Sequence, residues 1–346
     1  MGEKVFVSRL EDLMVAEELD FEPTPGFGKY RIFLEHAIPH PAKMNTNLLE
    51  FLIKKYTKEG DTVLDPMAGT GSLGVIASLH GRNAIQVELE PKFYEWMEKA
   101  RENVEKHPTF TPKGKIVNIL GDARKLSELL NSVDAVITSP PYANTYLGGG
   151  DPEKRRERLI KAGHNPEDFL GGRVRNAVLK HYGEVNAIIT SPPYASSLPN
   201  TGGPYGISLV YYSHPDNIGN LDNSEQDYGL LEKEKELNTL YAKLTRNGKP
   251  TYLSEMLKVY HEMYKVLKPN GLAIVVVKPY LRNKKIVDLP YYSYLLMERV
   301  GFMLEKLYKL KLRNMSFWRI LYYKKYPDTP RIAHEYVIVC RKPGDT

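Results

Sequence analysis

Short apolar runs alternate with longer amphipathic stretches along most of this chain. The apolar runs have the length of buried strands, and the stretches between them repeat apolar residues every three or four positions, as on one face of a helix. In chain order the predicted elements are a helix at 45–56, a strand at 61–65, a helix at 73–79, a strand at 83–87, a helix at 92–106, strands at 116–120 and 134–137, a helix at 253–267 and a strand at 272–278. This alternation predicts an α/β fold with a doubly wound, mostly parallel sheet.

The two ends of the chain depart from the alternating pattern. Residues 1–40 form an N-terminal extension, with a short helix predicted near 10–19 and a turn at 23–28. Near the other end, residues 302–312 and 332–339 are predicted to form an antiparallel pair that closes the sheet, after a helix at 293–300.

A long segment at 143–250 interrupts the alternation. It contains clustered glycines and a charged stretch at 151–161, and it is too long for a simple loop. We interpret it as an insertion over the carboxyl edge of the sheet, where ligands bind in doubly wound folds. The predicted organisation is an extension at 1–40, the first half of the domain at 41–142, an insertion for substrate recognition at 143–250 and the second half at 251–346.

The chain contains an internal repeat. Residues 132–144 (SVDAVITSPPYAN) align with residues 184–196 (EVNAIITSPPYAS) at nine of thirteen positions. Each copy consists of a predicted strand and the turn Ser-Pro-Pro-Tyr that follows it.

Composition and charge narrow the class of protein. Among 346 residues there is one cysteine, Cys340, so internal disulfides and cysteine-based metal sites are excluded, and the scattered histidines suggest no metal site. Apolar runs fall far short of the roughly 20 residues of a membrane span, and no basic-then-apolar signal opens the chain. We therefore expect a cytoplasmic protein without a membrane partner.

The net charge of +6 lies in the last 46 residues, which hold ten Lys or Arg and four Asp or Glu. Between Lys306 and Lys325 these cations alternate with aromatic residues. Cations attract phosphates and aromatic rings stack on bases, so this segment is a candidate nucleic-acid surface. The alternative is an amphipathic element with solvated lysines and buried aromatics.

A glycine-rich turn, Asp65-Pro-Met-Ala-Gly-Thr-Gly71, lies between a predicted strand and a predicted helix. Glycines there allow the backbone to approach a ligand, and the helix N-terminus favours negative charge. The next strand ends in the acidic residue Glu88, which suits a ribose diol. The turn lacks the Gly-Lys-Ser/Thr ending of a P-loop.

This arrangement resembles the S-adenosylmethionine-dependent methyltransferases, whose fold is Rossmann-like. The resemblance implies that the turn after the first strand holds the methionine part of the cofactor, that Glu88 holds the ribose, and that Asp122 and Ala123 lie at the adenine. His40-Pro41-Ala42-Lys43 resembles the preceding cofactor motif. The implied S-adenosylmethionine-binding residues are His40, Pro41, Lys43, Asp65, Pro66, Met67, Ala68, Gly69, Thr70, Gly71, Glu88, Leu89, Asp122 and Ala123.

The Ser-Pro-Pro-Tyr turn has chemistry suited to an exocyclic amine. Two prolines make the turn rigid, so carbonyl and hydroxyl acceptors can take the amine hydrogens while the tyrosine stacks on the base. Acceptors matter because the N4 lone pair of cytosine is delocalised into its ring. The candidate catalytic residues are Ser139, Pro140, Pro141, Tyr142, Ser191, Pro192, Pro193 and Tyr194. The first copy is favoured, because it follows Asp122 at a normal strand-to-strand interval, although the second copy stays a candidate.

The tetrapeptide also suggests the target. Ser-Pro-Pro-Tyr is typical of cytosine-N4 methyltransferases, whereas Asp-Pro-Pro-Tyr is commoner in adenine-N6 enzymes. Cytosine C5 methylation needs a cysteine nucleophile, and Cys340 lies far along the chain from both motifs. The cofactor motif comes first and no separate recognition domain is evident, which favours structured RNA such as ribosomal RNA over DNA. The alternatives are methylation of DNA at cytosine N4 or adenine N6, methylation of a protein glutamine amide, and a non-catalytic nucleic-acid binder. The oligomeric state is open.

Overall fold

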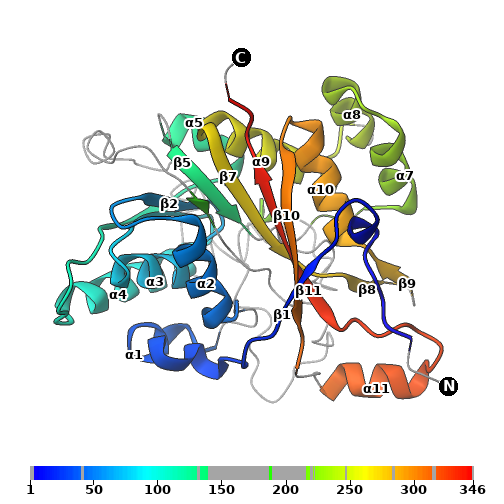
Figure 1. The fold of residues 1–346 in the computed structure, drawn as a ribbon. Coiled ribbons are helices and arrows are strands. Elements are labelled where there is room, and N and C mark those ends of the chain that lie inside the picture. The colour runs from blue at the N-terminus through cyan, green and yellow to red at the C-terminus, as the bar shows by residue number, and fades with distance from the viewer. Residues whose placement is uncertain are drawn as a thin grey trace, which may run out of the picture.

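The computed structural model describes residues 4–39, 43–130, 133–138, 187–188, 216–218, 221, 223–245, 248–282, 285–313 and 317–344 (Figure 1). A nine-stranded sheet forms its centre. Neighbouring strands in the sheet are β1 (Glu17–Leu19), β10 (Met303–Lys311), β11 (His334–Arg341), β7 (Leu267–Val277), β5 (Val133–Thr138), β2 (Thr62–Asp65), β3 (Asn83–Glu88) and β4 (Ile116–Leu120), and β6 (Ala187–Ile188) pairs with β7. A separate hairpin consists of β8 (Tyr280–Arg282) and β9 (Lys285–Val287).

The strand directions confirm the predicted doubly wound, mostly parallel sheet. Strands β7, β5, β2, β3 and β4 are parallel to one another, whereas β11 is antiparallel to both β7 and β10. The chain goes outward from β2 through β3 to β4 and then returns to the other side of β2 as β5. The strand order therefore reverses beside β2, and ligands of such sheets bind at the carboxyl ends of the strands around that point.

The helices form two packed groups. Helix α2 (Thr46–Tyr56) contacts α3 (Ser72–Leu79), which contacts α4 (Pro91–Lys106). A second group joins α5 (Leu126–Leu129), α9 (Tyr252–Val266) and α10 (Leu289–Arg299). In Figure 1 the first group lies near β2 and the second near β7 and β10. The other α-helices of the described residues are α1 (Arg31–Leu34), α7 (Glu225–Lys233), α8 (Leu237–Leu244) and α11 (Phe317–Lys325). Within the described ranges, none of them has the length and apolar character that a bilayer crossing requires.

Local sequence explains where the main elements begin. The Asn45 side chain accepts the backbone N–H groups of Asn47 and Leu48, so α2 starts at a capped end. The Thr251 side chain accepts from the Ser254 backbone N–H at the start of α9. The apolar run Ile274–Val277 is fully buried, as expected for a strand with neighbours on both edges and helices on its faces. The helices and strands predicted for 45–137 and 253–339 are confirmed.

The predicted helix near residues 10–19 is wrong. Residues 9–12 form a single 3₁₀ turn, and Glu17–Leu19 is a strand that pairs in parallel with Tyr308–Leu310. Strand β10 at the edge of the sheet offers backbone hydrogen-bond partners to Glu17–Leu19. These long-range hydrogen bonds favour a strand over the helix that the local spacing of apolar residues suggested.

The basic, aromatic segment is not one continuous surface. Its first part is strand β10, where Tyr308 is fully buried and its hydroxyl lies 2.7 Å from the Tyr56 hydroxyl. The cations on this strand pair with acids of the N-terminal extension, Lys306 with Glu17 at 2.6 Å and Lys309 with Glu11 at 2.9 Å. For β10 the amphipathic interpretation is therefore correct, and the interpretation as an open phosphate-binding surface is wrong.

Candidate functional site

The glycine-rich turn lies at the carboxyl end of β2, where the strand order reverses. Gly69 and Gly71 have φ values of 53° and 75°, in the left-handed region that glycine adopts without strain. Gly71 is also the residue before the first turn of α3, and a Cβ there would lie 3.0 Å from Met97 Cγ on α4. A side chain at position 71 would therefore push the start of α3 away from α4.

Three of the predicted cofactor segments meet at Glu88. Its Oε2 accepts the backbone N–H of Gly69 at 2.7 Å, and its Oε1 accepts that of Glu90 at 2.9 Å. Its backbone carbonyl accepts the N–H of Gly121 at 2.9 Å. The turn after β2, the end of β3 and the start of the segment after β4 are thus joined through one residue.

Two buried carboxyls give this junction an unusual charge balance. Burial raises the pKa of Glu88 to about 7, although the amides of Glu90 and Gly69 oppose the shift. Burial also raises the pKa of Asp65 well above its ordinary value, against the hydrogen bond from the Met67 amide. A positively charged ligand nearby would favour the ionised forms of both carboxyls.

Asp122 is engaged in an ion-pair network that the sequence did not reveal. Its side chain accepts the backbone N–H of Arg124, and the Arg124 guanidinium lies 2.6 Å from both Asp122 Oδ2 and Glu255 Oε2. Glu255 belongs to α9, so the network ties the segment after β4 to the second half of the domain. Arg124 carries no motif that would have identified it, because its partner Glu255 is 131 positions away in sequence.

Part of the predicted insertion contacts the same junction. Asn217 donates from Nδ2 to Glu90 Oε1 at 2.8 Å, and the Asp216 carbonyl accepts from Arg124 Nη2 at 3.2 Å. Ile218 is buried. The described residues 216–218 therefore lie against both the end of β3 and the segment after β4.

The remaining sequence predictions are distributed as follows. Lys43 donates from Nζ to the Ile38 carbonyl at 3.0 Å, and burial lowers the pKa of Lys43.

The other predicted cofactor residues that the structure describes lie at the ends of three neighbouring strands, β2, β3 and β4. They are Asp65, Pro66, Met67, Ala68, Gly69, Thr70, Gly71, Glu88, Leu89, Asp122 and Ala123. Outside the described residues lie His40, Pro41, Ser139, Pro140, Pro141, Tyr142, Ser191, Pro192, Pro193 and Tyr194. Within the part of the chain that the structure describes, no three His, Cys, Asp or Glu side chains form a group able to hold a metal ion.

Comparison with known proteins gives matches of three kinds. A family model described as DNA methylase matches residues 28–99 and 185–346. The chain is 30% identical over 153 residues to a tRNA (guanine(10)-N2)-dimethyltransferase of Methanothermobacter thermautotrophicus, which covers 43% of this chain and 42% of that protein. It is 41% identical over 66 residues to the type II methyltransferase M2.DpnII of Streptococcus pneumoniae, which covers 19% of this chain and 24% of that protein.

Among solved structures, TrmN from Thermus thermophilus aligns with 91% of this chain and 52% of its own at 12% identity and a TM-score of 0.43. The matches to the tRNA methyltransferase and to M2.DpnII each cover less than half of that relative's length, so the chain spans only part of these curated relatives. The family match includes the turn after β2 and Glu88, the two parts of the junction that contact each other directly.

Proposed function

Because the chain belongs to the DNA methylase family, which uses S-adenosylmethionine, we propose that it transfers a methyl group from this cofactor to the exocyclic N4 amine of cytosine in nucleic acid. The observation that carries the proposal is the junction at Glu88. It joins a glycine-rich turn, a buried carboxylate and the segment after β4 at the point where the strand order reverses. S-adenosylmethionine supplies a methyl group on a positively charged sulfur.

The residues of the junction fit that cofactor. Each Glu88 oxygen accepts one backbone amide and has a further lone pair to accept a ribose hydroxyl. Gly69 has no side chain and a positive φ, so a ligand can approach the backbone of the turn there, while Gly71 allows α3 to start close to α4. The raised pKa values of Glu88 and Asp65 also suit a cationic ligand, because its charge compensates theirs.

The base-holding role falls to the Ser-Pro-Pro-Tyr turns, which follow strands β5 and β6 in sequence. Acceptors on the two N4 hydrogens would direct the lone pair of nitrogen toward the methyl group, and the tyrosine would stack on the cytosine ring. Serine in place of aspartate supports cytosine over adenine. The target base must leave its stack to reach the turn, which is least costly in a loop or a single strand.

Two observations support different nucleic acids. The tRNA methyltransferase relatives align over the larger share of this chain, which favours structured RNA as the substrate. The description of the family and the type II methyltransferase relatives favour DNA, which is the second candidate.

Purified protein with tritiated S-adenosylmethionine tests the proposal. Total RNA, ribosomal subunits and genomic DNA from cells lacking the gene serve as acceptors, and the labelled nucleoside is identified after digestion. Label in N4-methylcytidine from RNA supports the leading proposal, and label in N4-methyldeoxycytidine supports the DNA alternative. Label on adenine contradicts the cytosine assignment. Binding of the cofactor without label in any pool contradicts a nucleic-acid substrate.

Two variants complete this experiment. Ser139→Ala and Ser191→Ala each remove the hydroxyl of one copy, and the proposal requires transfer to be lost in one of them or in their combination. Glu102→Gln is the control, because Glu102 is an exposed residue of α4 that pairs with Lys106 at 3.0 Å. Full activity in both serine variants and in their combination would overturn the role of the turns.

A further inference from the structure

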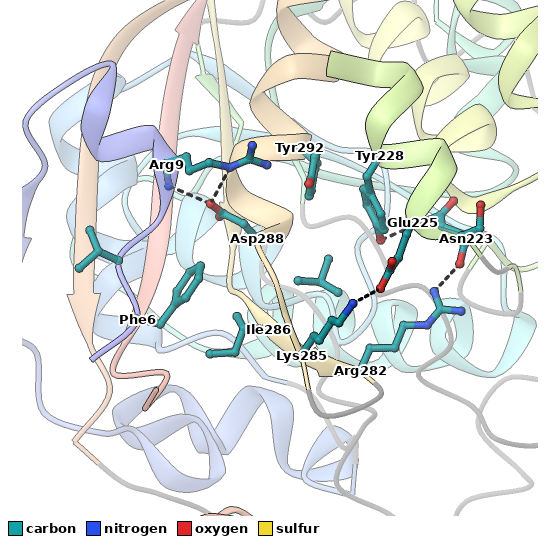
Figure 2. A pocket seen from close by; sticks show the side chains of 13 residues that line it. Phe6, Arg9, Asn223, Glu225, Tyr228, Arg282, Lys285, Ile286, Asp288 and Tyr292 are labelled. Atoms are coloured by element: carbon teal, nitrogen blue, oxygen red, sulfur yellow. Dashed lines mark hydrogen bonds and ion pairs between the residues drawn. The ribbon is translucent and has the colours of Figure 1, made fainter. Parts of the chain in front are cut away.

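A cavity opens beside the β8–β9 hairpin, and none of the residues that line it belongs to the Glu88 junction. It has a volume of about 620 Å³ and lies between residues 6–9, the start of α7, the hairpin and the start of α10 (Figure 2). A cavity of this size fits a nucleotide-sized ligand.

One wall of the cavity is aromatic. The rings of Tyr228 and Tyr292 lie with centroids 4.3 Å apart at an angle of 36°. The Tyr228 hydroxyl is 3.0 Å from that of Tyr280, and the Tyr292 hydroxyl donates to Glu232. Both rings are therefore held in place, as a surface for stacking requires.

Three cations surround this wall. Lys285 pairs with Glu225 at 2.7 Å, but both side chains are largely exposed, at 71% and 83%, so a phosphate could take the place of Glu225. Arg282 donates from Nη1 to the Asn223 carbonyl at 2.5 Å, which holds its guanidinium beside Asn223 at the edge of the cavity. Arg9 lies over the Tyr291 ring at 4.0 Å and pairs with Glu232 at 2.9 Å.

Both acids that line the cavity are engaged. Glu225 pairs with Lys285, and Asp288 accepts from Ser8 Oγ at 2.7 Å and from the Arg9 backbone N–H at 2.8 Å. The lining therefore combines fixed aromatic rings with three cations and two engaged carboxylates, a combination that can bind a base and its phosphate.

The cavity also lies on the side of the sheet where the substrate is expected. Strand β8 begins at Tyr280, three residues after β7 ends at Val277. Because β7 is parallel to β5, and β5 to β2, the carboxyl end of β7 shares an edge with the glycine-rich turn.

We propose that this cavity holds a nucleotide of the substrate strand that neighbours the methylated base, with its base against Tyr292 and its phosphate at Lys285 and Arg282. This inference rests on the proposed function. It assigns a substrate-binding role to the N-terminal extension, which supplies Arg9.

Fluorescence anisotropy with a labelled single-stranded RNA and a DNA duplex tests it. Lys285→Glu is expected to raise the Kd about tenfold. It is also expected to make the slope of log Kd against log salt concentration shallower, by about the contribution of one phosphate contact. Tyr292→Ala is expected to raise the Kd about fivefold or more, whereas Tyr292→Phe keeps the ring and the affinity. Lys106→Glu is the control, since Lys106 forms a similarly exposed ion pair on α4.

The outcomes separate the two proposals. If the parent protein binds and methylates nucleic acid and the Lys285 and Tyr292 variants match it, the assignment of the cavity is overturned and the proposed function stands. If the parent protein neither binds nor methylates nucleic acid, the proposed function fails.

An independent observation concerns the two copies of the repeat. Ala135 and Val136 of β5 pair in parallel with Leu272 and Ala273 of β7, and Ala187 and Ile188 of β6 pair in parallel with the same two residues. Ala187 is the residue 52 positions after Ala135, which is also the offset between Ser139 and Ser191. Equivalent residues of the two copies thus have the same partners in β7.

A strand residue has one neighbour on each side in a sheet. For Leu272 one side is taken by Arg341 of β11, so a single place remains. The geometry points to the two copies as alternative occupants of one strand position beside β7. The family match covers the second copy and omits the first, which supports the second copy as able to form the strand beside β7.

Proline substitutions test this inference, because proline in a central strand prevents ladder formation. Val136→Pro and Ile188→Pro are each expected to leave the protein folded, with the Tm lowered by no more than about 4 °C. The double variant is expected to lose cooperative unfolding, an effect far larger than the sum of the single changes. If one single variant is as damaged as the double, that copy is the sole strand and the inference is overturned.

Deletion of residues 139–190 provides a second test that does not depend on proline. It joins Thr138 to Ser191 and leaves one strand followed by one turn. The shortened chain is expected to unfold at a similar temperature and to bind S-adenosylmethionine with a Kd within about threefold of the parent value. Loss of folding would contradict the equivalence of the copies.

Discussion

The backbone N–H of Gly69 donates to Glu88 Oε2 at 2.7 Å, and this contact sets the shape of the candidate cofactor site. It ties the turn after β2 to the end of β3 through a carboxylate that accepts a second amide, that of Glu90. A carboxylate is needed here because both of its oxygens accept.

Glu88→Gln is therefore expected to weaken cofactor binding. The amide group of glutamine presents one acceptor and one donor, so its NH₂ would face one of the two backbone N–H groups. We expect the Kd for S-adenosylmethionine, measured by titration calorimetry, to rise by about 10- to 100-fold. Glu102→Gln on the exposed surface of α4 should leave it unchanged. Equal affinities in the two variants would contradict the role of Glu88.

The raised pKa of Glu88 predicts a pH dependence of stability. Its ordinary value is 4.5, and burial raises the pKa to about 7, so the folded protein binds a proton more tightly than the unfolded chain. The stability that Glu88 contributes is then fully present below pH 4.5 and is lost as the pH rises through 7. The raised pKa of Asp65 acts in the same direction.

Urea unfolding of the parent protein and of Glu88→Gln between pH 5 and 8 measures this contribution. The free energy of unfolding of the parent, relative to the variant, is expected to fall with rising pH, by at most about 1.4 kcal/mol per pH unit. Saturating S-adenosylmethionine should reduce the fall, since a cationic ligand favours the carboxylate. A difference that rises with pH would show that the pKa of Glu88 is lowered instead.

The sequence predicted the cofactor half of the fold well because its signals are local. Asn45 caps α2 two and three residues ahead, and the apolar run before Val277 marks a central strand by itself. Strand β1 has no such local signal, because its residue Glu17 pairs with Tyr308 at the far end of the chain. No pattern near Glu17 indicates this distant pairing, and the helical spacing near residues 10–19 suggested the wrong element.

In the candidate site, too, the residues with local signals were predicted and those with distant partners were not. The turn at 65–71 and Glu88 were identified by their positions relative to single strands. Arg124 and Asn217 were missed, because each acts through partners from distant segments. The cations of β10 were assigned to nucleic acid for the same reason, since the acids that neutralise them lie in the first 22 residues.

Gly74→Ala is expected to destabilise the protein. The Gly74 N–H donates to Gln86 Oε1 at 2.9 Å, and a Cβ at this position would lie 2.5 Å from Gln86 Nε2. Helix α3 must therefore move away from β3 or Gln86 must leave Asn118, at a cost of about 1–3 kcal/mol in the free energy of unfolding.

Gly229→Ala is the matched control for that measurement. Gly229 is also a helical glycine, in α7, and a Cβ there meets no atom within 4 Å. It should leave the free energy of unfolding unchanged or raise it by up to about 1 kcal/mol. Similar losses in the two variants would show that the tight contact between Gly74 and Gln86 does not limit α3.

Arg124→Ala tests whether the ion-pair network holds the two halves of the domain together. The Glu255 side chain is only 3% exposed and keeps Lys258 at 2.8 Å when the guanidinium is removed, whereas Asp122 and Glu255 lose the cation that joins them. We expect a loss of about 1–3 kcal/mol in the free energy of unfolding, because a partly buried ion pair is broken while Lys258 still compensates Glu255 in part.

The comparison is Arg101→Ala, since Arg101 pairs with Glu98 and Glu105 along α4 and these pairs are closer to solvent. There the expected loss is below about 1 kcal/mol. Cofactor affinity gives the second measurement: Arg124→Ala frees Asp122 and is expected to weaken S-adenosylmethionine binding, whereas Arg101→Ala is not. If both arginine variants lose the same stability and neither changes the Kd, the network after β4 has no special role in joining the cofactor site to α9.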